Sequence, residues 1–307
     1  MNHGALKARW EVEQVLKQFA EKDRGFDARW KVHSMDEGQQ AQLFSAQREN
    51  GSDGKAIVDE VVIKLYKQTS AEDRVAYLSE KHNLVVLSGL LDEREFGGWS
   101  MRSPTLYYAS DNPLALVMSV LPGEPISRWL QSSHNTIAAR ESAARAILAA
   151  LRTLWSRDVL YGDLNLKNVL FDPSNRTIGF IDPGLPEAFF SCDQVSRDWY
   201  PASRDLAYLL FSVAVNVKST LRKPAARSRQ WSFVKYLLQQ YVESIDCSTR
   251  QAMLLEEIRS CAQVHCEALD CSWSASGLWR RMVKSITRRC LNTALEELAK
   301  PNGQVKR

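Results

Sequence analysis

Tyr161-Gly-Asp-Leu-Asn-Leu-Lys-Asn168, followed a short distance later by Ile181-Asp-Pro-Gly184, is the part of this sequence that decides its fold. An apolar triplet at 169–171, a turn-forming cluster at 172–175 and a second apolar run at 178–181 separate the two segments. Apolar runs on both sides of a tight turn predict a β-hairpin. We therefore expect a loop, a short strand, a turn and a returning strand.

Three polar side chains of this region form a candidate site. The predicted hairpin brings Asn168 and Asp182 to the same end, where both can reach one magnesium ion. Their oxygen atoms suit a hard cation that also keeps water and phosphate oxygens as ligands. Asp163, on the preceding loop, is left to orient a hydroxyl group and take its proton. These groups, with a cation on the phosphates, are what phosphoryl transfer asks of a protein.

The first third of the chain alternates in polarity as strands do. One helix interrupts it, and Ser70-Ala-Glu-Asp73 has the form of the capping box that begins such a helix. Val75, Leu78 and Val85, with Leu84 and Leu87, give this helix an approximate apolar face. The strands are expected at 28–32, 42–47, 58–65, 105–109 and 114–121.

After Pro122-Gly123 the apolar residues recur at helical spacing. The sequence predicts helices at 137–155, 205–217, 231–244, 252–269 and 278–298. A β-rich part followed by a helical part predicts an α+β fold with two lobes. We expect an N-lobe at 1–121 and a C-lobe at 122–307.

The central segments resemble the catalytic and metal-binding loops of the protein-kinase-like superfamily, most closely its aminoglycoside-phosphotransferase-type branch of small-molecule kinases. The resemblance implies that Asp163 is the catalytic aspartate, Asn168 the second metal ligand and Asp182 the aspartate of the Asp-Phe-Gly motif. It implies ATP and Mg²⁺ as cofactors, and it covers roughly residues 30–215. Tyr161 stands where the family usually has histidine, and Pro183 where it has phenylalanine.

The N-terminal part carries the nucleotide-binding side of the resemblance. Val61-Val-Ile-Lys64 resembles the strand whose lysine contacts the ATP phosphates, and Glu80 is the first candidate for its ion-pair partner, with Glu72 as competitor. Residues 116–123 resemble the hinge that binds adenine, in which Met118 and Val120 are candidate contacts. Gly38 is the single glycine where protein kinases carry a glycine-rich loop with three.

Two features favour a small acceptor over a protein. Asn165 occupies the position at which protein serine/threonine kinases carry lysine, and no Ala-Pro-Glu sequence occurs. Asp205 follows Asp182 by only 23 residues, which leaves little room for a peptide-docking segment. Asp205 itself either braces the catalytic loop through hydrogen bonds or caps a helix. The expected acceptor is a hydroxyl of a small molecule, sugar or glycolipid; an atypical protein kinase and a pseudokinase scaffold are the alternatives.

The C-terminal helices offer further candidate contacts. Acidic residues at Glu187 and Asp193 would suit an aminoglycoside. The last helix is basic and amphipathic, a pattern compatible both with a solvated cationic face and with peripheral contact to an anionic membrane. Candidate aromatic residues for stacking on a sugar are Trp231, Phe233, Tyr241, Trp273 and Trp279. The basic residues of the last helix are Arg280, Arg281, Lys284, Arg288 and Arg289.

Composition and charge limit the partners and the cellular location that we expect for this protein. The net charge of +4 does not indicate a nucleic-acid partner, and we expect none. The chain begins without the apolar core of a signal peptide, and its apolar runs are too short to span a bilayer, so we expect a cytoplasmic protein. The six cysteines are then expected as reduced thiols. Cys261 and His265 share a helix face, but we interpret them as core residues rather than metal ligands.

Overall fold

The structure is a computed structural model whose fold is α+β, as the sequence predicts. The chain divides into two compact units, the first formed by Met1–Gly89 with Ser103–Leu121 and the second by Leu90–Arg102 with Pro122–Arg307. The residues described are 3–22, 29–37, 40–48, 60–92, 94–184, 199–215, 224–272 and 277–299, of which 3–5, 36–37, 224, 269–272 and 277–282 are described by their backbone alone.

The first unit is built on an antiparallel sheet with strand order β1-β2-β3-β7-β6. Four of its strands match the predicted ones to within two residues at each end, while β1 continues five residues beyond its predicted end. Residues of alternate parity on β3 and β7 enter different cores, because successive side chains of a strand point to opposite faces. The strands are β1 (Trp30–Glu37), β2 (Ala41–Arg48), β3 (Glu60–Tyr66), β6 (Leu106–Asp111) and β7 (Leu114–Ser119).

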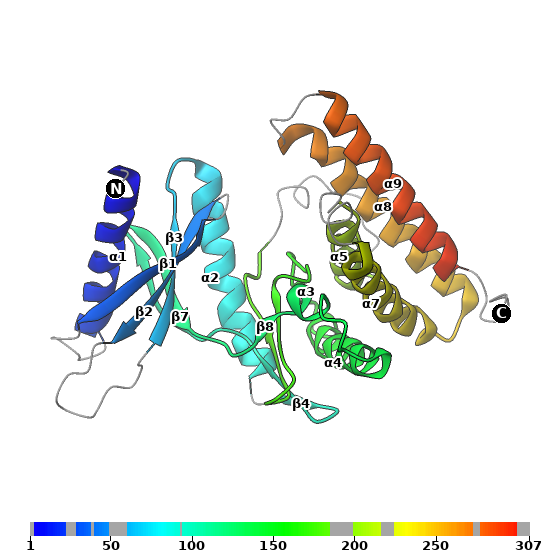
Figure 1. Ribbon diagram of the computed structural model, residues 1–307, viewed down its shortest axis with the longest axis horizontal. Helices are drawn as coiled ribbons and strands as arrows, with labels where there is room; N and C mark the ends of the chain where they lie inside the picture. Colours follow the sequence, from blue (N-terminus) through cyan, green and yellow to red (C-terminus); the bar gives the residue numbers. More distant parts are fainter. Residues whose placement is uncertain are drawn as a thin grey trace. The chain divides into compact units, whose positions relative to one another are not determined.

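Helices cover both faces of this sheet (Figure 1). The helix α1 (His3–Lys22) packs against Ile63 and Val117, and α2 (Ala71–Leu91) packs Tyr77 and Leu84 against Leu116 on the other face. We did not predict α1 from the sequence. Its helical spacing of buried residues was nevertheless visible there: Ala8, Val12, Val15, Leu16 and Phe19.

The start of α2 is the predicted capping box. The Asp73 amide donates to Ser70 Oγ at 3.3 Å, and the Ser70 amide donates to Asp73 Oδ2 at 3.0 Å. The predicted apolar face was wrong in part, because Val75, Leu78 and Val85 are exposed. The buried face is instead spaced by three and four residues through Tyr77, Glu80, Leu84, Leu87 and Leu91. Because the buried stripe contains a glutamate, Glu80, a prediction based on hydrophobicity does not recognise it.

The second unit contains a small mixed sheet with order β4-β5-β10-β9-β8. Its central hairpin is the one predicted between the two central sequence segments. Residues 90–102, expected in the N-lobe, belong instead to this unit, because β5 pairs in parallel with β10. The strands are β4 (Arg94–Phe96), β5 (Trp99–Arg102), β8 (Glu124–Pro125), β9 (Val169–Asp172) and β10 (Thr177–Phe180).

Gly123 occupies a position in this unit that only glycine suits. Its φ of +104° lies in the region that L side chains rarely adopt. A Cβ atom added there would come 2.8 Å from the Phe171 carbonyl carbon. The close approach lets β8 pair with β9 directly after the glycine.

Six described helices complete the second unit, and α8 and α9 run side by side within it (Figure 1). The five long ones correspond to the predicted helices. Among the described residues, none of the helices combines the length and apolar character needed to cross a membrane. The helices are α3 (Ile126–Trp129), α4 (Ile137–Trp155), α5 (Ala202–Val215), α7 (Pro224–Glu243), α8 (Ser248–Ser272) and α9 (Gly277–Leu298).

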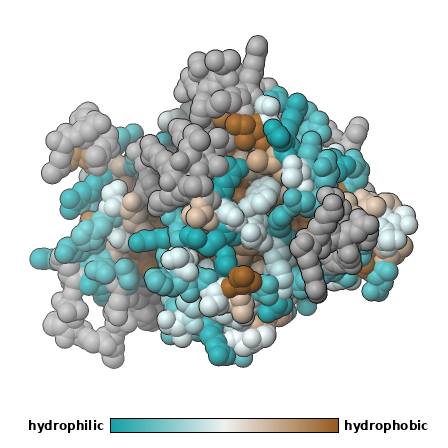
Figure 2. All heavy atoms as spheres, turned by 45° about the vertical axis from the view of Figure 1, so that its right-hand side comes forward, coloured by the Kyte–Doolittle hydropathy of each residue, from teal (hydrophilic) through white to brown (hydrophobic). Residues whose placement is uncertain are grey.

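Figure 2 shows one face of the molecule, on which most described residues are hydrophilic and the hydrophobic ones form small separate patches. Large exposed hydrophobic side chains on α1 and α2 include Trp10, Leu78 and Val85. Scattered exposure of this kind is usual for a folded protein.

Candidate functional site

Asp205, on α5, anchors the loop that carries Asp163. Its side chain is completely buried and accepts three hydrogen bonds, from Trp155 Nε1 at 2.8 Å, from the Tyr161 amide at 3.1 Å and from the Gly162 amide at 2.8 Å. Burial raises the pKa of this carboxyl group to about 6, and the three donors oppose that rise. We considered two roles for Asp205, bracing the loop or capping the helix. These hydrogen bonds show that it braces the loop.

The hairpin then joins the two central sequence segments at one end. Phe180 pairs with Val169 at the last position of the ladder, and the Ile181 amide donates to the Asn168 carbonyl oxygen at 2.9 Å. The buried Tyr161 hydroxyl donates to the Ile181 carbonyl oxygen and lies 3.3 Å from the Asn168 carbonyl oxygen. Asn168 and the residue after Ile181, Asp182, therefore lie at the same end of the hairpin, as the sequence predicts.

Side-chain hydrogen bonds hold Asp163 beside Asn168. Asn165 Nδ2 donates to Asp163 Oδ1 at 3.0 Å, and Asn168 Nδ2 donates to Asp163 Oδ2 at 2.9 Å. Tyr208, on α5, makes a further side-chain hydrogen bond to Asp163. Asn168 uses its amide nitrogen toward Asp163, and its Oδ1 is an oxygen of the kind that can coordinate a hard cation.

The environment of Asp163 raises its pKa to about 6. Burial is the main cause, and the charge of Asp182 is the second. The hydrogen bonds from Tyr208, Asn165 and Asn168 act in the opposite direction, since they favour the charged form. A carboxylate with a raised pKa, next to a second carboxylate, is an arrangement common at functional sites.

Asp182 and Asn168 form a donor set that fits magnesium. Asp182 adopts a left-handed backbone conformation, with φ of +57°, which aspartate tolerates better than most residues. Its charge acts on Asp163, so the two carboxylates lie close to each other. Carboxylate and amide oxygens of this kind are ligands that Mg²⁺ prefers.

The first unit contains a second polar cluster, formed by Lys64, Tyr66 and Glu80. Lys64 Nζ lies 2.6 Å from Glu80 Oε2, and the Tyr66 hydroxyl donates to the same oxygen. The side chains of Lys64 and Glu80 are only 13% and 6% exposed. Lys64 is thus paired with Glu80, the first of the two candidates, while Glu72 lies exposed in the first turn of α2.

We expect this ion pair to be strongly coupled. Lys64→Met leaves the buried Glu80 carboxylate without the Lys64 ammonium group, so the thermal midpoint should fall. Lys64→Met combined with Glu80→Gln should cost less than the sum of the single changes. A double-mutant cycle on urea unfolding should give a coupling of about 1–3 kcal/mol. Lys31→Met, an exposed lysine on β1, is the matched control and should change stability by less than about 0.5 kcal/mol. Additive single effects would contradict the pairing.

The other residues that we expected to contact the nucleotide differ in how far the structure buries them. Met118 is buried in β7, in register with Val62 on one side and Leu106 on the other. Val120 follows the end of β7 and its side chain is 41% exposed. Gly38 lies outside the described residues.

Sequence reasoning missed three residues that support these sites. Tyr66, Trp155 and Tyr208 each donate a hydrogen bond to a carboxylate of the sites. Tyr66 and Trp155 belong to apolar strand or helix patterns, in which an aromatic residue is indistinguishable from ordinary core. The spacing of Tyr208, one turn after Asp205 on the same helix, is the signal that could have identified it.

The candidate acceptor residues are only partly described. Phe233 is buried, and Tyr241 packs edge-on against Trp155, with ring centres 5.1 Å apart. Phe233 is therefore a core residue of this unit, whereas Tyr241 is only half-buried. Glu187, Asp193 and Trp273 lie outside the described residues, as does the side chain of Trp279.

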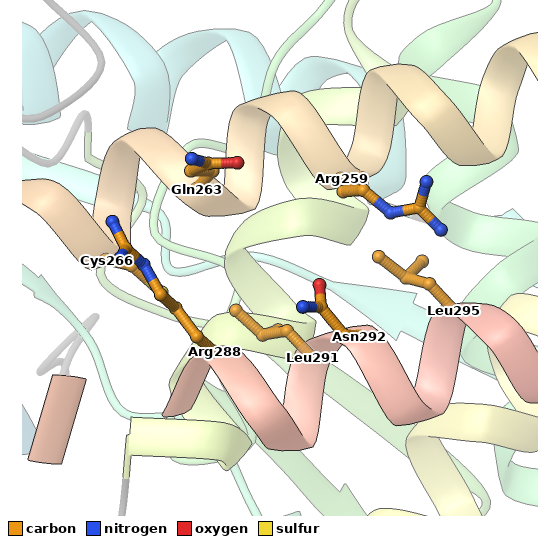
Figure 3. Close-up of a pocket in the computed structure, with 7 residues that line it drawn as sticks. All are labelled: Arg259, Gln263, Cys266, Arg288, Leu291, Asn292 and Leu295. Atoms are coloured by element: carbon orange, nitrogen blue, oxygen red, sulfur yellow. The ribbon is translucent and has the colours of Figure 1, made fainter. Parts of the chain in front are cut away.

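A separate concavity of about 150 Å³ lies between α8 and α9 (Figure 3). Arg259 and Arg288 contribute its cationic groups, but each lies near a glutamate: Arg259 Nη1 is 2.5 Å from Glu256 and Arg288 Nη2 is 3.4 Å from Glu267. These pairs reduce the positive charge of the concavity. Its lining is Arg259, Gln263, Cys266, Arg288, Leu291, Asn292 and Leu295.

Comparison of the chain with models of known protein families, and with curated proteins, finds no match.

Proposed function

We propose that this chain is a phosphotransferase that moves the γ-phosphate of MgATP to a hydroxyl group of a small molecule, sugar or glycolipid. The observation that carries the proposal is the assembly of Asp163, Asn168 and Asp182 around the end of one hairpin. Asp205 fixes the backbone of the loop that holds Asp163 through two hydrogen bonds. This set of residues supplies a base and two cation ligands, which the reaction requires.

A bilobal kinase-like fold is part of the proposal. The five-stranded antiparallel sheet, with a helix that supplies Glu80 to Lys64, is what such a fold places over the nucleotide. The helical second unit supplies the base and the metal ligands. Lys64 would contact the ATP phosphates, with Glu80 and Tyr66 holding it. Met118 and Val120 remain proposed adenine contacts, through their backbone.

Each polar residue of the second unit has a separate part in the proposed reaction. Asp163 orients the acceptor hydroxyl and takes its proton as the oxygen–phosphorus bond forms. Asn168 and Asp182 would hold Mg²⁺, which when bound neutralises charge on the phosphates. Asn165 and Asn168 keep the Asp163 carboxylate in one orientation through their amide groups. The protein forms no covalent bond to the substrates in this proposal. Most of the rate acceleration would therefore come from positioning the reacting groups.

The acceptor class rests on the sequence features near the site. Asn165 points its side chain to Asp163 and to the Lys167 amide, so the position filled by lysine in protein kinases here serves the loop itself. This supports a small acceptor over a peptide. The basic residues of α9 that are described, Lys284, Arg288 and Arg289, leave peripheral contact with an anionic membrane as a proposal for a glycolipid acceptor.

The test is binding of MgATP followed by an acceptor screen. Titration calorimetry with the purified full chain should detect MgATP, and Asp182→Asn should weaken binding by at least about 10-fold while leaving binding in EDTA unchanged. ATP consumption is then measured with sugars, amino alcohols, aminoglycosides, lipid extracts and peptides. Absence of MgATP binding would overturn the proposal. Phosphorylation of peptides alone would favour a protein kinase, and binding without consumption a pseudokinase.

A further inference from the structure

We propose that Tyr208 is a positioning residue that aligns the Asp163 carboxylate, so that α5 holds both the backbone of the loop and the side chain at its centre. The inference rests on the proposed function, because it assigns Tyr208 a part in the step in which Asp163 acts. Tyr208 forms a hydrogen bond to Asp163.

The position of Tyr208 on α5 explains how one helix can do both. Asp205 and Tyr208 are three residues apart and therefore share a face of the helix. Asp205 fixes the loop backbone through the amides of Tyr161 and Gly162. From the same face of α5, Tyr208 bonds to the carboxylate of Asp163, the residue that follows Gly162.

The other two donors to Asp163 orient the carboxylate relative to the loop, but they do not tie it to α5. Asn165 and Asn168 are two and five residues away along the same loop, so they move with it. Among the donors to Asp163 that the described residues provide, Tyr208 is the one from a different element. Its hydrogen bond therefore fixes the carboxylate relative to the helical core rather than relative to the loop.

The ring of Tyr208 is itself held in place. It packs edge-on against His265 of α8, with ring centres 5.2 Å apart, and it contacts Phe211 with ring centres 6.1 Å apart. His265 is buried, and burial lowers its pKa to about 4, so it is neutral near pH 7 and adds no charge beside the site. Burial and the charge of Asp163 raise the pKa of Tyr208, which keeps its hydroxyl group protonated as a donor.

A fixed carboxylate has a specific consequence for the reaction. With both oxygens accepting hydrogen bonds, the carboxylate presents its remaining lone pairs in a defined direction to the attacking hydroxyl. Loss of the Tyr208 hydroxyl leaves the base in place but less well aligned, and misplacement of this kind lowers rates by about 10- to 100-fold. ATP binding should not change, since Tyr208 is proposed to act through Asp163.

The experiment compares Tyr208→Phe with the wild-type full chain, with MgATP as donor and either water or a hydroxyl compound found in the screen as acceptor. In the water reaction the bond between the γ-phosphorus and the β,γ-bridging oxygen breaks, a bond to the water oxygen forms, Asp163 takes the water proton, and ADP and phosphate leave. Tyr208→Phe should lower kcat about 10- to 100-fold and leave KM for ATP within about twofold. The MgATP-binding stoichiometry from calorimetry should stay at the wild-type value.

Two further variants separate positioning from a structural effect. Tyr236→Phe removes a phenol that accepts a hydrogen bond from Arg145 elsewhere in the same unit, and it should retain wild-type kcat. Adding Tyr208→Phe to Asp163→Asn should cause no further loss, because the base that Tyr208 aligns is gone. A structural defect would instead lower the residual rate of Asp163→Asn as well, and would overturn the inference.

The two proposals fail in different ways. If Asp163→Asn is inactive while Tyr208→Phe has wild-type kcat, the inference about Tyr208 is wrong and the proposed function stands. If Asp163→Asn keeps full activity, the proposed function is wrong. A wild-type chain that consumes MgATP with neither water nor any compound of the screen overturns both.

Discussion

Asp163→Asn should lower kcat for MgATP-dependent phosphotransfer by about 10²- to 10⁴-fold while MgATP still binds. An asparagine amide keeps the size of the side chain, but it cannot take a proton from the acceptor. Its oxygen can still accept one of the hydrogen bonds now donated by Asn165 and Asn168, so the loop should keep its conformation. The measurement is steady-state turnover, with calorimetry for MgATP affinity.

The matched control is Asp158→Asn, an exposed aspartate just before the same loop, which should leave turnover within about twofold. Asparagine also tolerates the positive φ that Asp158 adopts. Equal turnover of Asp163→Asn and the wild-type chain would show that Asp163 is not the base.

Asp205→Ala should destabilise the second unit by about 3–5 kcal/mol. The substitution leaves three buried donors without their acceptor: the indole of Trp155 and the amides of Tyr161 and Gly162. Each such loss costs about 1–3 kcal/mol, and relief of the buried charge offsets part of the total. Urea unfolding monitored by tryptophan fluorescence should show a lower midpoint, and turnover should fall because the loop loses its anchor.

Asp172→Ala offers the control for this change. Asp172 also accepts three hydrogen bonds, from the Ser174 and Asn175 amides and from Asn175 Nδ2, but in a turn that solvent reaches. Water can replace the lost acceptor there, so we expect a cost below about 1 kcal/mol. If both aspartate variants cost the same, burial of the Asp205 hydrogen bonds would not be what stabilises the loop.

The buried face of α2 illustrates where a prediction from the sequence fails. Val75, Leu78 and Val85 fit an apolar stripe, yet they are exposed. The true stripe contains Glu80, whose burial makes sense only once Lys64 and Tyr66 are seen to surround its carboxylate. A partner on another strand cannot be recognised from the spacing within the helix, because it depends on a contact between residues 16 positions apart.

The predicted assignment of residues 90–102 to the N-lobe was wrong for a related reason. They follow α2 in the chain, and their neighbours in sequence belong to the first unit. Their strand β5 pairs with β10, about 75 residues later, and this pairing joins them to the second unit. Parallel pairing with a distant strand leaves no local signal, since the partner is far away in sequence.

The sequence alone determined the parts of Tyr161–Asn168 and Ile181–Gly184 that depend on neighbours in the chain. The turn at 172–175 and the apolar runs beside it were enough to predict the hairpin, and with it the placement of Asn168 and Asp182 at the same end. Local spacing and turn chemistry act over a few residues, so they can be read directly. The tertiary structure decided what lies around this hairpin: the brace from Asp205, the hydrogen bond from Tyr208 and the pairing of Lys64 with Glu80. These contacts join elements far apart in sequence, because buried polar groups take their partners from whichever elements pack beside them.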